Sequence, residues 1–487
     1  MSTPAGTKGD LDFDAPEYDA CIIGSGPNGL SAAAVLANAG LSVLVVEARD
    51  ELGGGMRTAE LTLPGFQHDI CSTAHPLGIL SPYLSTLPLD QHGLRWCEPP
   101  ASVAHPLEDE PAPLLHLSIE ETARELEADG PAYRRLIEPF LRNPEGLLAD
   151  ALGPLGIPRH PLLLARFGMN AIRSAAGLAR AKFKTPRARA LFAGHAGHSI
   201  LPLERPLTAA LGLLFSVTGH VKSWPVAAGG SQSIPRALES YLKTKGVRFR
   251  TGLRVRTLGD LPPSRVVLFD TSPRQLIEIA GSDLPAGYKR RLGRYRYGPG
   301  SFKLDWALDG PIPWRDERCG QAATVHIGGT LAEIAAAEAA VWRGEHPDRP
   351  YMILVQASLF DSGRAPTGKH TGYAYWHVPH GSTVDLTDVL ERQVERFAPG
   401  FRDLILARRA MNTRDFEAHN PNYVGGAIAG GVADIPQAFL RPVARLEPYR
   451  TPNPRIFLCS AATPPGGGVH GMCGTHAARS VLRRLGK

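Results

Sequence analysis

The residues with the clearest chemical potential lie near the start of the chain, where three glycines have the spacing G-x-G-x-x-G. Gly24, Gly26 and Gly29 follow an apolar run and precede an Ala-rich stretch, and a second apolar run ends in Glu47. Glycines at this spacing allow a tight turn and a close approach of the backbone to a pyrophosphate, and the acid can hold ribose hydroxyls. The pattern predicts a βαβ unit that binds a dinucleotide, and the Glu47 carboxylate disfavours a 2′-phosphate.

A second glycine motif follows directly, with the sequence Glu-Ala-Arg-x-x-Leu-Gly-Gly-Gly-x-Arg-Thr over residues 47–58. It resembles the second glycine motif of the FAD-dependent amine oxidase and phytoene desaturase superfamily. In that family the loop lies along the pyrophosphate and the ribityl chain, so the resemblance implies FAD as the cofactor. We expect Arg57 to face the diphosphate or the flavin edge. The cofactor residues implied in this part of the chain are Gly24, Gly26, Pro27, Asn28, Gly29, Glu47, Ala48, Gly54, Gly55, Met56 and Arg57.

The end of the chain repeats the order of strand, Gly-rich loop and helix, over residues 455–487. It is similar to the C-terminal flavin motif of the phytoene-dehydrogenase-related proteins, as are the stretches 65–72, 229–231 and 420–426. In this fold a helix that begins near Gly471 directs its positive end at the reduced flavin and stabilises its negative charge. The resemblance adds Val255, Gly467, Gly468, Val469, Gly471 and Met472 to the expected cofactor residues.

The resemblance implies an α/β fold in which a discontinuous Rossmann-like FAD-binding domain carries an inserted α+β substrate domain. A second G-x-G-x-x-G with a matching acid is absent from the sequence, so a tightly bound pyridine nucleotide is not expected. Electrons would then leave to O2, a quinone or a protein carrier. The expected FAD-binding domain comprises 17–80, 222–290 and 440–487, the substrate domain comprises 81–221 and 291–439, and 1–16 is expected to be a disordered tail.

Four residues are candidates for a direct role in the chemistry, each with a structural role as the alternative. His68 and Asp69 lie in the family-like run Gly-Phe-x-His-Asp, His470 lies within the flavin loop, and His377 lies on an alternating strand with Tyr375. That strand could form the floor of a substrate cavity. No metal site is predicted, because the six cysteines contain no C-x-x-C pair. Further candidate residues are His75, His195, His198, His419 and Tyr423.

Composition narrows the class of protein. The chain has 487 residues, of which 43% are hydrophobic and 21% charged, which excludes a disordered protein or a coiled coil. The first 17 residues lack the apolar stretch of a signal peptide, so we expect a cytoplasmic location. Residues 151–203 contain no Asp or Glu but many Arg and Lys, interleaved with Leu and Ala. This segment could contact an anionic membrane, ring the mouth of an apolar tunnel, or form a solvated helix face, whereas nucleic acid is not expected as a partner.

The resemblance therefore implies an FAD-dependent oxidoreductase that desaturates or dehydrogenates an apolar, polyunsaturated or lipid-like substrate by hydride transfer to flavin N5. Three alternatives stay open. They are isomerisation of a polyene without net redox change, oxidation of an amine, and a non-catalytic flavoprotein that binds a lipid or a partner. Amine oxidation would need an aromatic cage, and only 7% of the residues are aromatic.

Overall fold

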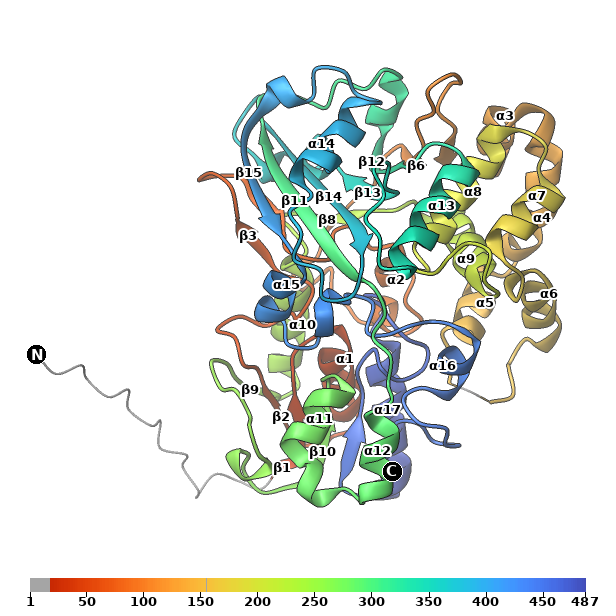
Figure 1. Cartoon of the computed structure of the whole chain (residues 1–487). Helices are drawn as coiled ribbons and strands as arrows, with labels where there is room; N and C mark the ends of the chain where they lie inside the picture. The colour runs from red at the N-terminus through yellow and green to blue at the C-terminus, as the bar shows by residue number, and fades with distance from the viewer. Residues whose placement is uncertain (1–17, 155) are drawn as a thin grey trace, which may run out of the picture.

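The computed structural model describes residues 18–154 and 156–487, which form two large sheets and two small two-stranded sheets with helices around them (Figure 1). The first sheet has five strands in the order β16-β10-β1-β2-β9, and all the pairings between them are parallel. Its strands come from distant parts of the chain. They are β1 (Tyr18–Ile23), β2 (Val43–Val46), β9 (Arg248–Arg250), β10 (Ser264–Phe269) and β16 (Ile456–Leu458).

Helices cover both faces of this sheet, as expected for a parallel sheet whose strands are apolar on both sides. On one face α1 (Pro27–Asn38), α10 (Ser233–Thr244) and α17 (Met472–Leu485) share a hydrophobic core with β1 and β2. On the other face lie α11 (Pro273–Ala280) and α12 (Ala286–Leu292). Helices α1 and α17 lie side by side, and Gly474 of α17 allows their backbones to approach closely. A Cβ atom at Gly474 would lie only 1.8 Å from the Asn28 carbonyl oxygen.

The second sheet has seven strands in the order β15-β11-β14-β13-β12-β6-β7. Its pairings are antiparallel except for the parallel pair β12 and β6. One face packs on α14 (Thr387–Glu395) through a core that contains Trp306 and Leu390. The strands are β6 (Ala101–Ala104), β7 (Leu114–His116), β11 (Gly300–Leu308), β12 (Ala322–Ile327), β13 (Met352–Val355), β14 (His370–Val378) and β15 (Ile405–Met411).

A helical layer lies beside the second sheet, on the right in Figure 1. Its core combines residues of α4, α8 and α9 with residues of α13. The helices are α3 (Ile119–Glu125), α4 (Gly130–Leu141), α5 (Pro144–Ala151), α6 (Pro161–Ala171), α7 (Ala175–Lys182), α8 (Pro186–Gly197), α9 (Thr208–Lys222) and α13 (Leu331–Trp342). Smaller elements connect the two units: β3 (Thr58–Glu60), β4 (Gln67–Asp69), α2 (Pro76–Ile79), β5 (Trp96–Cys97), β8 (Val226–Ala227), α15 (Thr413–His419) and α16 (Ile435–Leu440).

The predicted fold class is confirmed: a Rossmann-like parallel sheet is assembled from separate stretches, and an α+β unit is inserted between them. The residue boundaries of the two domains stay predictions. The expected tail, 1–16, lies outside the described residues. Among the described residues no helix has the length and apolar character needed to cross a membrane.

Candidate functional site

Both units contribute to one continuous cavity of about 730 Å³. Its lower part is lined by the Gly-rich loops that follow β1, β2 and β16, and its upper part by β12, β13 and β14 of the second sheet. In open α/β sheets, ligands bind at the carboxyl ends of the parallel strands, and the lower part lies there. We call the lower part the groove and the upper part the chamber.

The two glycine motifs lie directly against each other in the groove. Gly24 has φ +99°, and a Cβ atom there would lie 2.8 Å from the Asp270 carbonyl oxygen. A Cβ atom at Gly29 would lie 2.2 Å from the Gly24 carbonyl oxygen, and one at Gly54 would lie 2.9 Å from the Cα atom of Gly26. Only bare backbone fits at these positions. The groove is therefore shaped by main chain rather than by side chains.

Glu47 directly follows β2 and is buried at the groove. One carboxylate oxygen accepts hydrogen bonds from the backbone N–H of Ser25, at 3.1 Å, and from its hydroxyl, at 2.5 Å. The other oxygen accepts from the Arg49 N–H at 3.0 Å and lies 3.2 Å from the guanidinium of Arg57. These contacts fix the carboxylate at the place expected for a ribose-binding acid.

Arg57 is buried, and its guanidinium holds the second glycine loop together. It donates hydrogen bonds to the Glu51 carbonyl, at 2.8 and 3.2 Å, and to the Gly54 carbonyl, at 3.2 Å. It also lines the cavity. Arg57 is therefore not a surface residue, and its contact with a cofactor stays a prediction.

The sequence analysis missed Asp270, a buried carboxyl group at the end of β10. Its Oδ2 accepts a hydrogen bond from the N–H of Gly29 at 2.9 Å, so the carboxyl lies directly behind the first glycine loop. Burial, reinforced by the charge of Glu47, raises the pKa of Asp270 to about 7. No spacing along the chain indicates its contact with a loop 241 residues away.

The structure brings most of the expected cofactor residues to the cavity. Those that line it are Gly24, Gly26, Pro27, Asn28, Glu47, Ala48, Gly54, Gly55, Arg57, Val255, Gly467, Gly468 and Val469. Gly29, Met56, Gly471 and Met472 are not among the lining residues. Gly471 instead packs on α1, where a Cβ atom would lie 1.9 Å from the Ser31 hydroxyl oxygen.

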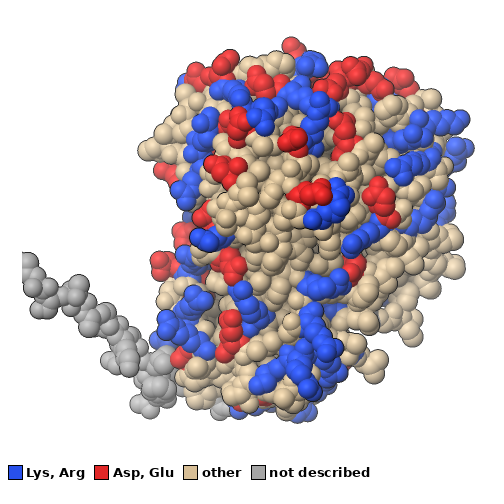
Figure 2. All heavy atoms as spheres, in the orientation of Figure 1, with Lys and Arg blue, Asp and Glu red and all other residues tan. Residues whose placement is uncertain are grey.

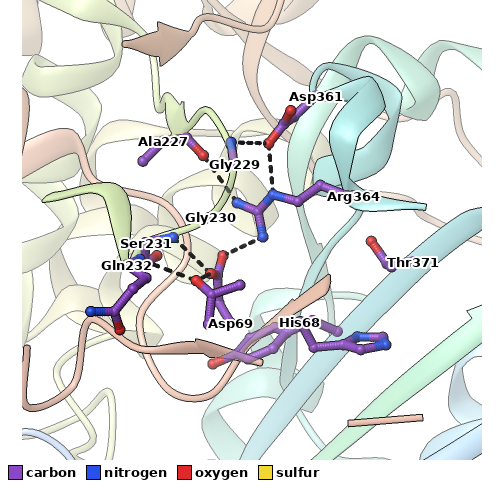
Figure 3. A network of polar contacts seen from close by, with 12 residues as sticks. His68, Asp69, Ala227, Gly229, Gly230, Ser231, Gln232, Asp361, Arg364 and Thr371 are labelled. Carbon is purple, nitrogen blue, oxygen red and sulfur yellow. Dashed lines mark hydrogen bonds and ion pairs between the residues drawn. The ribbon is translucent and has the colours of Figure 1, made fainter. Parts of the chain in front are cut away.

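Asp69 lies outside the cavity lining and forms the centre of a buried polar network (Figure 3). Its carboxylate accepts from Arg364 at 2.9 Å, from the Thr58 hydroxyl at 2.6 Å and from the Ser231 N–H at 2.8 Å. Burial alone would raise the pKa of this carboxyl, but the Arg364 charge and the hydrogen bonds from Thr58, Ser231 and Arg364 together outweigh it and hold the pKa below its usual value. Arg364 also pairs with Asp361 at 2.7 Å. The network joins β4, the 229–231 turn and the inserted unit, which is a structural role.

His68 also does not line the cavity. Its ring lies 2.8 Å from the Thr62 hydroxyl and 3.6 Å from Asp305, and Figure 3 shows it apart from Arg364. Burial and the nearby Lys303 charge lower the pKa of His68 to about 3. The ring is therefore neutral and enclosed, so the structure gives no support to the expected direct role of His68 or Asp69.

The other two candidates are likewise enclosed. His377 pairs through Nδ1 with Glu338 on α13, at 2.9 Å. His470 Nδ1 accepts a hydrogen bond from the Met472 N–H at 3.0 Å. This bond provides a partner for one of the first amides of α17. Neither side chain lines the cavity. The candidates that do line it are His75, His198, His419 and Tyr423.

The register of the second sheet explains the floor of the chamber. Thr324, Val355 and Tyr373 are paired neighbours on three adjacent strands, so their side chains point to the same face. The next row on this face contains Ile353 and Tyr375. All five residues line the cavity. The alternating strand predicted as a cavity floor therefore contributes its two tyrosines, and not His377.

The basic segment 151–203 forms α6, α7 and α8. On α6, Leu162 is 87% exposed and Met169 is 68% exposed, whereas Arg187 on α8 is paired with Glu125 and Glu127. Figure 2 shows a further gathering of Lys and Arg at the lower end of the molecule, over α12 and α17. Positive charge is therefore not confined to this segment, and its contact with a membrane stays a prediction.

Comparison with known proteins gives three findings. Residues 22–84 match the family of NAD(P)-binding Rossmann-like domains. The chain is 27% identical to pyridine nucleotide-disulfide oxidoreductase domain-containing protein 2 of Rattus norvegicus, over 96% of this chain and 94% of the relative. The structure of putrescine oxidase bound to putrescine is similar at a TM-score of 0.61 with 17% identity, covering 97% of this chain and 100% of the other. The predicted resemblance is confirmed.

The chain therefore contains a Rossmann-like dinucleotide-binding domain and is similar over nearly its whole length to a protein named as containing an oxidoreductase domain. A local match gives one further relative, a limonene dehydrogenase polypeptide of Castellaniella defragrans, at 31% identity over 24% of this chain and 21% of the relative. The likeness to putrescine oxidase concerns the fold, because the identity is low.

Proposed function

We propose that this chain is an FAD-dependent oxidoreductase that dehydrogenates an apolar substrate. The observation that carries the proposal is the single cavity, because the glycine-lined groove opens directly into a chamber of mainly apolar and aromatic side chains. A dinucleotide in the groove would thus share one continuous space with a substrate in the chamber. The name of the limonene dehydrogenase relative points in the same direction, since limonene is a hydrocarbon.

The residues present fit FAD. The contacts that a Cβ atom would make at Gly24, Gly29 and Gly54 leave room only for backbone beside a pyrophosphate, and Glu47 is fixed where a ribose is expected. The N-terminus of α1 directs its free amides toward the same place, which favours an anion. When bound, FAD supplies an acceptor for the hydride that the substrate loses.

This chain's own contribution is to position the substrate and exclude water. The chamber side of the cavity presents Leu77, Leu211, Phe215, Ile353 and Val355, and these apolar side chains favour a substrate with little charge. Among the lining residues of that side there is no Asp, Glu, Lys or Arg. A protonated amine would lose its hydration there without gaining a counter-charge, which weighs against amine oxidation.

His75 lines the cavity, and its hydrogen bonds define which ring nitrogen carries the proton. The Ser231 hydroxyl donates to the Ser72 carbonyl at 2.6 Å, so it accepts from Nε2–H of His75 at 2.8 Å. The neutral ring then carries its lone pair on Nδ1, which has no partner among the described residues. Burial lowers the pKa of His75 to about 4 and keeps it neutral near pH 7.

The direct test uses purified protein with its bound cofactor. We expect flavin absorbance, and bleaching of that absorbance when an apolar, oxidisable substrate is added without oxygen. Conversion without bleaching would favour isomerisation, and bleaching by putrescine or cyclohexylamine would favour amine oxidation. A colourless protein that FAD cannot reconstitute would refute the proposal.

A further inference from the structure

Four histidines meet beside the chamber floor: His195 and His198 at the C-terminal end of α8, His326 on β12, and His105 after β6. All of them except His198 are buried. Their rings lie close together, with centroids 5.0 Å apart for His198 and His326 and 5.6 Å apart for His195 and His326. Nothing in the proposed function uses this cluster. The described residues contain no group of His, Cys, Asp or Glu arranged to hold a metal ion, so the cluster needs another explanation.

The hydrogen bonds assign a proton to each outer ring. His105 Nε2 lies 2.7 Å from the Gly329 carbonyl oxygen, which can only accept, so Nε2 carries the proton. The Ser216 hydroxyl donates to the Gly212 carbonyl at 2.8 Å and therefore accepts from His195 Nδ1–H at 3.0 Å. Neutral His105 therefore carries its ring proton on Nε2, and neutral His195 carries its ring proton on Nδ1.

The remaining pair consists of His326 and His198, whose Nε2 atoms lie 2.9 Å apart. His326 Nδ1 is buried without a partner among the described residues and faces Gly194, where a Cβ atom would lie only 2.6 Å away. A buried N–H without an acceptor is rarer and more costly than an unused lone pair. The His326 proton therefore belongs on Nε2, where it is donated to His198. The proton of a neutral His198 must then be on Nδ1.

This Nδ1–H of His198 is available to a ligand. His198 lines the cavity and is only partly buried, and its Nδ1 makes no hydrogen bond with the described residues. Burial, together with the charge of His377, lowers the pKa of His198 to about 3, which keeps the ring neutral. Two residues further on, Ile200 has φ +55°, a strained conformation for a β-branched residue and one that clusters at functional sites.

We propose that His198 is a neutral hydrogen-bond donor that recognises the carbonyl or hydroxyl oxygen of an otherwise apolar substrate. The inference deepens the proposed function and rests on it, because it assumes that the chamber holds the substrate. A ketone or an alcohol offers a lone pair to Nδ1–H, whereas an ammonium group offers none and finds no carboxylate in the chamber. A pure hydrocarbon fills the chamber but leaves the donor unpaired.

The test uses four ligands with the same ring: cyclohexanone, cyclohexanol, cyclohexane and cyclohexylamine. Calorimetric titration of the FAD-loaded chain should show cyclohexanone binding about tenfold more tightly than cyclohexane, the value of one hydrogen bond. Cyclohexylamine should bind about a hundredfold more weakly than the ketone, because its charge is left uncompensated. Tighter binding of the amine, or equal binding of ketone and hydrocarbon, would overturn the inference.

Variants locate the effect at His198. His198→Phe should remove the preference for ketone over hydrocarbon, and His198→Asn, which keeps a donor near the Nδ1 position, should retain most of it. Leu211→Val should weaken the binding of all four ligands by the same factor, so the ratios of their affinities should not change. If His198→Phe does not fold, the order of ligand affinities measured with the unaltered chain still tests the inference. Flavin absorbance separates the two failures, since a chain without FAD refutes the proposed function, whereas an FAD-loaded chain that prefers the amine refutes only the role of His198.

Discussion

The groove and the chamber are two halves of one cavity, but they are built differently. The groove is shaped by backbone at Gly24, Gly29 and Gly54, where no side chain fits. The chamber is shaped by side chains, such as Trp224 and Thr324, which come from separate elements. A ligand that is common to many proteins can be held by main-chain geometry, whereas a particular substrate needs particular side chains. We therefore expect the two halves to respond differently to substitution.

The largest expected effect concerns the polar network of Asp69 and Arg364, which joins the inserted unit to the part of the chain that forms the groove. Arg364→Met leaves the Asp69 carboxylate buried without its cation, and this should lower the free energy of unfolding by about 3–5 kcal/mol. Denaturant unfolding measures the change. Arg343→Met is the control, because Arg343 pairs with Glu345 at the surface, and its removal should leave stability unchanged. Equal stability of the two variants would show that the junction does not depend on this network.

The next effect tests the backbone-built groove. Gly29→Ala places a Cβ atom 2.2 Å from the Gly24 carbonyl oxygen and should distort the loop. We expect FAD affinity to fall by about a hundredfold, which equals roughly 2.7 kcal/mol. Fluorescence titration of the cofactor-free protein with FAD measures it. Gly287→Ala is the matched control, because Gly287 has no atom within 4 Å of an added Cβ. Normal affinity in Gly29→Ala would contradict the role of the loop.

A smaller effect is expected at the one acid of the groove that the sequence pattern predicts. Glu47→Ala removes the acceptor for Ser25 and the partner of Arg57, together with the expected ribose contact. The same titration should show FAD affinity reduced by about thirtyfold, the value of a charge-assisted hydrogen bond. Glu51→Ala, at an exposed position of the same loop, should bind FAD normally. If both variants bind equally well, Glu47 does not contact the ribose.

Asp270 should make cofactor binding depend on pH. Its pKa of about 7 means that the carboxyl becomes charged as pH rises from 6 to 8, behind the loop expected to hold a diphosphate. We expect FAD affinity to fall by about fivefold over this rise, because like charges repel. Cofactor-free protein should also lose stability over the rise from about pH 4 to 7, since the folded state retains this proton longer than the unfolded state. Asp270→Asn should flatten both profiles, and unchanged profiles would exclude Asp270 as their cause.

The smallest effect concerns the outer surface of the inserted unit. If α6 contacts an anionic membrane, the double variant Leu162→Ser and Met169→Ser should bind anionic vesicles about threefold more weakly in a sedimentation assay. Leu406→Ser is the control, because Leu406 is exposed on β15. Absence of vesicle binding by the unaltered chain would leave α6 as a solvated helix.

The same contrast explains what could be predicted from the sequence. The groove follows from local motifs, because spaced glycines after an apolar strand have few other uses. Tyr375 could be placed on a cavity floor from strand alternation alone. In contrast, the motif around His68 and Asp69 showed that these residues matter but not why, since the partner Arg364 lies 295 residues away from Asp69. The proton on His198 depends on a contact with His326, and no spacing along the chain indicates that pairing.

The close crossing of the first and last helices has a consequence for biosynthesis. Gly474 lies against Asn28, so the wall behind the groove is completed by a residue that is synthesised 446 positions later. The nascent chain cannot assemble this wall before α17 has left the ribosomal exit tunnel. We therefore expect the groove to be completed only after α17 has been synthesised, and a polypeptide shortened before this helix would leave the first helix without its neighbour.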